Sequence, residues 1–163
     1  MTGEPLNVLF LCPTNTCRSV IAEVLLNTVG QGRFRAFSAG RKPNGKINPY
    51  VCETLKQVGY DISAQTPKSW DNFVTPNAPR LDAVITLAGS LNSVALPIWY
   101  SNPVRVHWNF ANPEQVEGED DERTSAYRRC YGDLEQQMLK LAGLPTSGVR
   151  GRALANLLQS ISP

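Results

Sequence analysis

Histidine is nearly absent from this chain of 163 residues, which contains only His107. Cys12 and Cys17 have no second close pair of cysteines or histidines at the spacing that zinc sites need. We therefore expect no metal site and no bound cofactor. For His107 we expect a buried, hydrogen-bonded position beside Trp108.

Long apolar runs and long runs of one charge are also missing. Lys and Arg number 16 against 14 acidic residues, and the net charge of +2 is spread along the chain, which argues against nucleic acid and membrane surfaces as partners. Met1–Pro5 carry no basic segment, and the apolar run Val8–Leu11 is too short for a signal sequence or a membrane span. We expect a cytoplasmic protein whose four cysteines are free thiols, ligands or catalysts and not structural bridges.

The length favours a single domain over 1–163, with a core at about residues 7–144 and a short C-terminal extension. Apolar and β-rich runs predict strands at 7–11, 34–39, 81–87 and 104–108. Helical spacing predicts one helix capped by Ser19 and ended by Gly30, and others at 49–58, 124–142 and about 154–158. The acidic run 117–122 is expected to be a solvated loop.

Alternating strands and helices predict an α/β fold with three layers, in which helices cover both faces of a four-stranded, mostly parallel sheet. In such sheets ligands bind beyond the carboxyl ends of the strands. The segment Cys12–Arg18 (CPTNTCR) follows the first predicted strand and leads into the first predicted helix. It therefore lies at the edge where a ligand is expected.

Backbone N–H groups in such a loop have no partners within the helix, and the helix dipole adds partial positive charge. A tetrahedral oxyanion fits there, enclosed by the loop residues Pro13–Cys17 with their free N–H groups and held by the fork of the Arg18 guanidinium. The same field favours a thiolate at Cys12, to which Ser19 can donate a hydrogen bond. The alternative is that Cys12 is a small buried hydrophobe and Arg18 a surface residue.

Individual loop positions carry further expectations. Asn15 should stabilise the loop through its side chain or by adopting a left-handed conformation. Pro13 removes one N–H donor from the cradle, while Thr14 and Thr16 complete the loop. Cys17 either faces the helix as a structural residue or supplies a second thiol.

The segment Val8–Glu23 (VLFLCPTNTCRSVIAE) resembles the low-molecular-weight protein tyrosine phosphatases and the arsenate reductases built on the same fold. The resemblance covers about residues 7–144 and implies that Cys12 is the nucleophile and that the loop binds arsenate or phosphate. Further segments are similar to the arsenate reductase branch in order and spacing: Ser38–Gly40, Lys68–Asp71, Ala78–Asp82, Val106–Trp108 and Asn112–Pro113.

Three positions depart from that family. Reductases of this branch pass oxidation to two further cysteines after the third strand, where this chain has Ala88 and Leu96. Both lineages place an aspartate where this chain has Asn112, which cannot transfer a proton in the working pH range. General acid catalysis contributes about 10² to 10⁴ in rate, so phosphomonoester hydrolysis should be inefficient unless Glu114 substitutes.

Arsenate reduction needs a second thiol to release arsenite from the Cys12 adduct. Candidates are Cys17, since a Cys12–Cys17 disulfide is an oxidation product in phosphatases of this fold, and an external thiol such as glutathione, mycothiol or thioredoxin. Cys52 and Cys130 are interpreted as ordinary residues on apolar helix faces.

Three functions remain open at this point. The first is an arsenate reductase that uses Cys12 and a second, external thiol. The others are a low-activity protein tyrosine phosphatase and a non-catalytic oxyanion-binding regulatory protein.

Overall fold

A computed structural model describes residues 4–163. Residues 1–3, part of the opening segment considered above, lie outside the described residues. The strands are β1 (Leu6–Cys12), β2 (Phe34–Gly40), β3 (Ala83–Thr86) and β4 (Val104–His107). The α-helices are α1 (Arg18–Val29), α2 (Pro49–Gln57), α3 (Asp120–Ala142) and α4 (Gly151–Ser160), and three 3-10 helices are η1 (Trp70–Phe73), η2 (Gly89–Leu91) and η3 (Pro113–Gln115).

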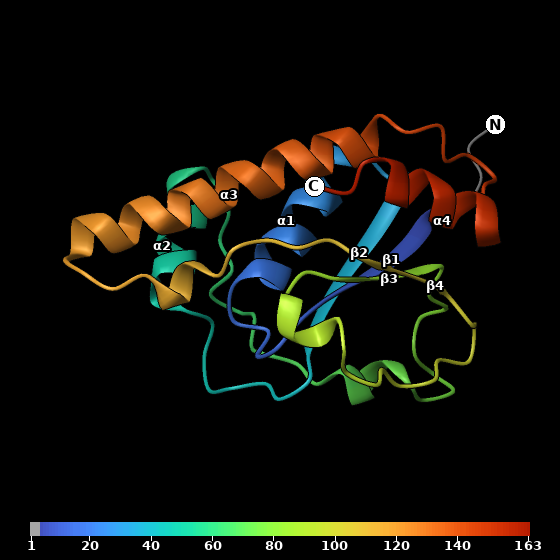
Figure 1. The fold of residues 1–163 in the computed structure, drawn as a ribbon, viewed down its shortest axis with the longest axis horizontal. Helices are drawn as coiled ribbons and strands as arrows, with labels where there is room; N and C mark the ends of the chain where they lie inside the picture. The colour runs from blue at the N-terminus through green and yellow to red at the C-terminus, as the bar shows by residue number, and fades with distance from the viewer. Residues whose placement is uncertain (1–3) are drawn as a thin grey trace.

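The four strands form one parallel sheet in the order β2-β1-β3-β4 (Figure 1). This confirms the predicted α/β class. Because β1 is central and buried on both sides, it reads as a continuous apolar run. Its last residue, Cys12, pairs with Gly40 at the end of β2. Both residues lie at the carboxyl edge of the sheet.

The two faces of the sheet are covered unequally. Side chains from all four α-helices pack on the face that carries Val8 and Phe10 of β1. Leu9 and Leu11 point to the other face, where η1, η2 and their connecting loops cover the sheet. Helices therefore lie on both faces as predicted, but on the second face they are short 3-10 helices.

Two predicted helix starts were wrong. Helix α1 begins at Arg18 with Cys17 as its N-cap residue, so Ser19 lies inside the first turn and does not cap it. Helix α3 begins at Asp120, which places half of the acidic run inside the helix instead of in a loop. Acidic side chains in a first turn are favoured by the positive end of the helix dipole. The apolar spacing used to predict the helix begins only at residue 124, so it did not indicate this earlier start.

Helix α4 extends the predicted short helix in both directions and closes one end of the core. Leu154 and Leu158 are buried in the cluster below α1 and α3. The indole Nε1 of Trp108 donates to the carbonyl of Leu158 at 3.1 Å. Gln137 of α3 donates to the carbonyl of Ile161 at 2.8 Å. In residues 4–163 no helix is both long and apolar enough to cross a membrane.

Candidate active site

The loop between β1 and α1 is held from outside by its carbonyl groups. The carbonyl of Pro13 accepts from the N–H of Lys42 at 2.9 Å, and that of Thr16 accepts from the N–H of Asn48 at 3.1 Å. By contrast, the loop N–H groups that follow Pro13 donate to no other residue in the described part of the chain. They are therefore free for an anion in the concavity of the loop.

Gly40 lets the end of β2 approach this loop closely. A Cβ atom at this position would lie 2.8 Å from the backbone nitrogen of Asn15 and 2.8 Å from the carbonyl carbon of Thr14. Real Cβ atoms do not approach backbone atoms so closely, so only glycine fits unless the backbone moves. The Ser-Ala-Gly segment noted in the sequence thus supports the loop from its side.

A chain of hydrogen bonds runs from the backbone of Lys68 to the sulfur of Cys12. The N–H of Lys68 donates to Asn15 Oδ1 at 2.8 Å, which fixes the orientation of the Asn15 amide. Asn15 Nδ2 then donates to Ser19 Oγ at 2.9 Å. Ser19 Oγ lies 2.8 Å from Cys12 Sγ. The Ser19 hydroxyl accepts from Asn15 and still has its own proton, which it can donate to the sulfur.

Asn15 adopts the left-handed conformation, with φ of 55°, and is fully buried. The sequence offered side-chain bonding or a left-handed backbone as alternatives, and the structure shows both. The unusual backbone conformation is tolerated because the Asn15 side chain satisfies both of its polar ends.

Arg18 is only 6% exposed, so it is not the surface residue of the alternative interpretation. Its Nη1 donates to the carbonyl of Phe110 at 2.9 Å. Its Nε is buried and has no hydrogen-bond partner among the described residues. An unpaired buried donor is costly unless a ligand satisfies it. Arg18 therefore offers a ready donor to an anion at the start of α1.

A second set of contacts borders the loop on the side of α2 and α3. Thr16 Oγ1 donates to Glu114 Oε2 at 3.1 Å and lies 2.7 Å from Thr14 Oγ1. Asn48 Nδ2 donates to Glu114 Oε2 at 3.0 Å and to Tyr127 Oη at 2.8 Å. Burial raises the pKa of Tyr127 to about 12, so its hydroxyl stays protonated. Glu114 is the carboxylate placed beside the loop.

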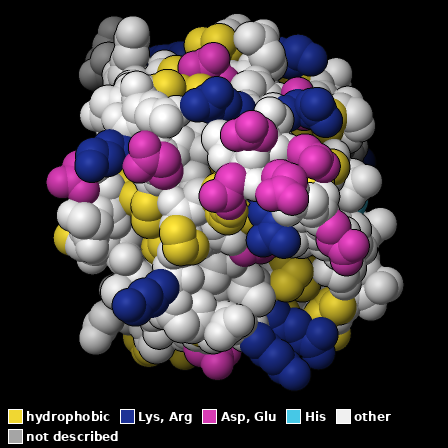
Figure 2. All heavy atoms as spheres, turned by 90° about the vertical axis from the view of Figure 1, so that its left-hand side faces the viewer, with side chains coloured by type: hydrophobic (Ala, Val, Ile, Leu, Met, Phe, Trp, Pro, Cys, Tyr) yellow, Lys and Arg dark blue, Asp and Glu magenta, His cyan; other side chains and the backbone are white. Residues whose placement is uncertain are grey.

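Acidic side chains gather around this end of the molecule, over the start of α3, and Lys and Arg side chains lie around them (Figure 2). The surface near the loop therefore has mixed charge. Attraction of an oxyanion must come from the amides and Arg18 within the loop itself.

Asn112 serves as the N-cap of η3, where its Oδ1 accepts from the N–H of Glu114 at 3.0 Å. It lines a surface pocket together with Phe110, Cys130 and residues of α3. A different pocket, lined by Thr14, Thr16 and Glu114, lies on the other side of η3. The position at which the family has an aspartate thus holds a structural cap.

Cys17 is 1% exposed and packs in the apolar core cluster to which α1 and α3 contribute. A hydrogen-bonding contact with the Cys130 thiol, followed by burial, raises the pKa of Cys17 well above its ordinary value. Sequence reasoning missed this neighbour, because Cys130 shares the apolar face of α3 with Tyr127 and Leu134. Its only signal is that it is a cysteine on an inward-facing position.

The two positions of the family relay, Ala88 and Leu96, lie on the opposite face of the sheet from Cys17. His107 is half-buried, less than expected, and its Nδ1 lies 2.7 Å from Thr86 Oγ1. Residues 4–163 contain no group of three or more His, Cys, Asp or Glu side chains that could hold a metal ion.

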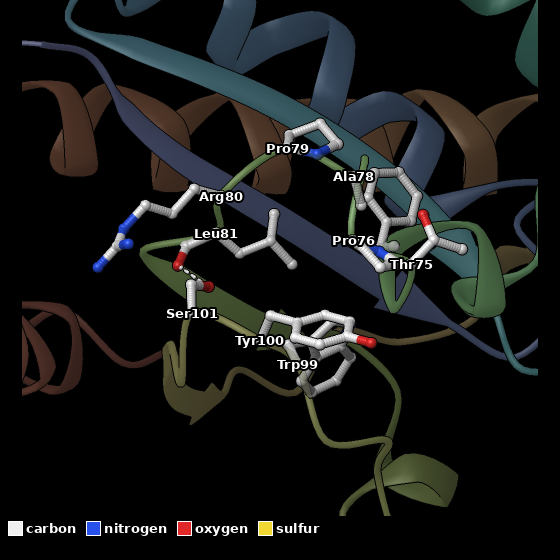
Figure 3. A pocket seen from close by; sticks show the side chains of 10 residues that line it. Thr75, Pro76, Ala78, Pro79, Arg80, Leu81, Trp99, Tyr100 and Ser101 are labelled. Carbon is white, nitrogen blue, oxygen red and sulfur yellow. Dashed lines mark hydrogen bonds between the residues drawn. The ribbon is translucent and has the colours of Figure 1, made fainter.

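A further pocket lies at the amino ends of β3 and β4, remote from the loop. Figure 3 shows Pro76, Pro79, Trp99 and Tyr100 around it, with the Ser101 hydroxyl bonded to the carbonyl of Leu81. None of its lining residues belongs to the loop between β1 and α1. It therefore plays no part in the candidate active site.

Comparisons with known proteins identify the family of this chain. The family profile named low molecular weight phosphotyrosine protein phosphatase matches residues 7–154. The arsenate reductase of Halalkalibacterium halodurans is 34% identical over 135 residues, which cover 83% of this chain and 94% of that protein. The glutaredoxin arsenate reductase of a Synechocystis species is 30% identical over 82% of this chain and 94% of its own length.

A solved structure described as an arsenate reductase in the phosphate binding state superimposes with a TM-score of 0.64. It is 30% identical and covers 84% of this chain and 96% of its own. The profile match and these identities show that the chain belongs to the low molecular weight phosphotyrosine protein phosphatase family, and that it is similar to the arsenate reductases within it.

Proposed function

We propose that this protein is an arsenate reductase in which Cys12 is the nucleophile. The observation that carries the proposal is the hydrogen-bond chain from Lys68 through Asn15 and Ser19 to Cys12 Sγ. It holds the Ser19 hydroxyl beside the sulfur, where a hydrogen bond from that hydroxyl would stabilise the thiolate that nucleophilic attack requires. We place the reaction in the cytoplasm, where thiols are kept reduced.

Arsenate would bind in the concavity of the loop. The free loop amides and the unpaired Nε of Arg18 are donors for its oxygens. The contact of Arg18 Nη1 with the Phe110 carbonyl orients the guanidinium before the anion arrives. Cys12 then attacks arsenic, an oxygen leaves as water, and a sulfur–arsenic bond forms.

Reduction follows when a second thiol attacks Cys12 Sγ. The sulfur–arsenic bond breaks, its electron pair stays on arsenic, and arsenite departs. Neither Ala88 nor Leu96 can supply that thiol, so reducing equivalents must finally come from an external thiol reductant. Glutathione, mycothiol and thioredoxin are the candidate donors, and a relative is named for glutaredoxin.

A phosphatase is the second candidate, favoured by the position of Glu114 beside the loop. Its carboxylate is held by Thr16 and Asn48, which turns it toward the loop threonine. Asn112 cannot donate a proton, and its side chain caps η3. Without a general acid, hydrolysis should lose about 10² to 10⁴ in rate. Arsenate reduction depends more on thiols than on an acid.

The test is production of arsenite from arsenate with each donor in turn, in the native protein, Cys12→Ser and Cys52→Ser. We expect turnover with at least one donor, no turnover in Cys12→Ser, and native turnover in the control Cys52→Ser. Absence of arsenite with glutathione, mycothiol and the thioredoxin system would refute the reductase.

Hydrolysis of an aryl phosphate separates the remaining functions. Slow hydrolysis that is lost in Cys12→Ser and rises steeply in Asn112→Asp would support the phosphatase. Arsenate binding by titration with no reaction of either kind would instead identify an oxyanion-binding regulatory protein.

A further inference from the structure

A polar pocket borders the loop between β1 and α1. Thr14 and Thr16 form its wall on the loop side, residues of the segment 44–49 form a second wall, and Glu114 of η3 completes the lining. The two walls are joined, because the carbonyl of Thr16 accepts from the N–H of Asn48 at 3.1 Å. A molecule bound in this pocket therefore lies directly beside the loop that carries the nucleophile.

The lining carries one basic and one acidic side chain that are free to bind a ligand. Lys46 and Glu114 are both exposed, and within residues 4–163 the one ion pair lies elsewhere, at the start of α4. Glu114 Oε2 accepts from Thr16 Oγ1 at 3.1 Å and from Asn48 Nδ2 at 3.0 Å. Glu114 Oε1 has only Thr16 Oγ1, at 3.5 Å. The carboxylate is thus held in place while one of its oxygens remains available.

Binding of an oxyanion alone does not explain this carboxylate. A negative charge beside the loop repels arsenate, and the repulsion grows as the distance falls. An ammonium group bound at Glu114 would offset that repulsion. Lys46, in the same lining, offers a cation to a carboxylate. The pocket therefore suits a ligand that carries an ammonium group and a carboxylate close together.

We propose that this pocket binds the γ-glutamyl end of a small thiol of the glutathione type, which supplies the second thiol of the reaction. The inference rests on the proposed reduction of arsenate and names its electron donor. The α-ammonium group of the ligand contacts Glu114, and its α-carboxylate contacts Lys46. Mycothiol carries neither charge, and a protein dithiol presents no free γ-glutamyl group, so neither fits the pocket as well.

The reach of such a ligand agrees with the position of the pocket. An extended γ-glutamyl-cysteine unit spans about 9 Å from its first α-carbon to its sulfur. Thr14 lines the pocket and is two residues from Cys12, so their α-carbons are separated by about 7 Å at most. A thiol anchored by its γ-glutamyl end can therefore reach Cys12 Sγ.

The steps balance in atoms and electrons. The donor thiolate attacks Cys12 Sγ of the arsenic adduct, the sulfur–arsenic bond breaks, arsenic keeps the electron pair, and arsenite departs. Cys12 is left in a mixed disulfide with the donor. A second donor molecule attacks the donor sulfur of that disulfide, and Cys12 leaves as a thiolate beside the Ser19 hydroxyl. Overall, arsenate and two thiols give arsenite, one disulfide and one water.

The first experiment needs no arsenate. S-methylglutathione, whose sulfur cannot react, is titrated into the full chain and followed by amide NMR shifts. We expect saturable binding that weakens about two- to fivefold in Lys46→Gln and in Glu114→Gln, the range for exposed ion pairs. The matched controls Lys56→Gln and Glu117→Gln change side chains outside the lining and should bind like the native protein. Absence of binding, or equal weakening in the controls, would overturn the proposal.

The contact of each charge is checked on the ligand as well. N-acetylation of S-methylglutathione removes its ammonium group, so the acetylated ligand should bind the native protein and Glu114→Gln with the same affinity. Its binding should still weaken in Lys46→Gln, because the carboxylate remains. Equal losses of the two ligands in Glu114→Gln would overturn the assignment of the ammonium group to Glu114.

The second experiment compares arsenite production with glutathione and with 2-mercaptoethanol, a thiol that has neither charge. The preference of the native protein for glutathione should fall about two- to fivefold in Lys46→Gln and persist in Lys56→Gln. An unchanged preference in Lys46→Gln, or turnover with the thioredoxin system and none with glutathione, would overturn the proposal. If the native protein makes no arsenite with any donor, the reductase fails, while the titration still decides whether the pocket binds a γ-glutamyl thiol.

Discussion

Removing the Ser19 hydroxyl tests the electrostatic basis of the site. In Ser19→Ala the sulfur of Cys12 loses a donor at 2.8 Å. A hydrogen bond to a charged group contributes about 1.5 to 3 kcal/mol. At about 1.4 kcal/mol for each factor of ten, the thiolate becomes roughly 10 to 150 times less favoured.

A less stabilised thiolate is also a better nucleophile, with a Brønsted slope of about 0.4 to 0.5. On a free-energy scale, about half of the lost thiolate stabilisation therefore appears as a slower reaction. We expect iodoacetamide to alkylate Cys12 about four to twelve times more slowly in Ser19→Ala at mildly acidic pH.

The assay follows alkylation of residues 1–18 by mass spectrometry across pH. Ser38→Ala is the matched control, because Ser38 is equally buried and its hydroxyl donates to Glu23 instead of to the sulfur. That control should alkylate at the native rate. Equal rates in Ser19→Ala and the native protein at every pH would refute the proposed hydrogen bond to the thiolate.

Two further predictions concern stability. Gly40→Ala should lower the free energy of unfolding by about 1 to 3 kcal/mol and weaken phosphate binding, because its Cβ presses on the backbone of Thr14 and Asn15. Gly132 lies on α3, and a Cβ atom there would meet nothing within 4 Å, so Gly132→Ala should instead stabilise the protein by about 0.4 to 1 kcal/mol. Chemical denaturation measures the free energy of unfolding of both variants, and equal changes in the two would contradict the close contact inferred at Gly40. Burial raises the pKa of Glu23 in the folded protein. The contribution of this group to stability is therefore fully present when the pH is below the pKa of the unfolded chain, and it is lost as the pH rises through the pKa of the folded protein. Glu23→Gln should therefore be more stable than the native protein at neutral pH and no more stable below pH 4. Urea unfolding measures both, and the same stability difference at the two pH values would contradict the predicted pH dependence.

The loop that carries the chemistry could be predicted from the sequence because its determinants are local. A buried strand ending in Cys12, five intervening residues and Arg18 at a helix start stand next to one another in the chain. The parallel sheet follows from strands that alternate with helices. Even here one detail failed, since the start of α1 is set by the backbone of the loop and not by the capping preference of Ser19.

Contacts between distant segments could not be predicted from one sequence. Thr16 and Glu114 are 98 positions apart, and the chain gives no local sign that they bond. The meeting of Cys17 with Cys130 depends on the packing of α3 across α1, which only the folded core determines. An apolar-face pattern explains why Cys130 is buried, but it does not reveal which side chain it will touch.

The docking of α4 also constrains when the protein can become native during synthesis. Strand β1 leaves the ribosome well before α4, and the core beneath α1 and α3 gains Leu154 and Leu158 only after translation has passed them. Until then, the indole of Trp108 has no acceptor at Leu158 and apolar surface faces water. The nascent chain is thus exposed to aggregation, and to chaperone capture, until α4 has been synthesised and has docked.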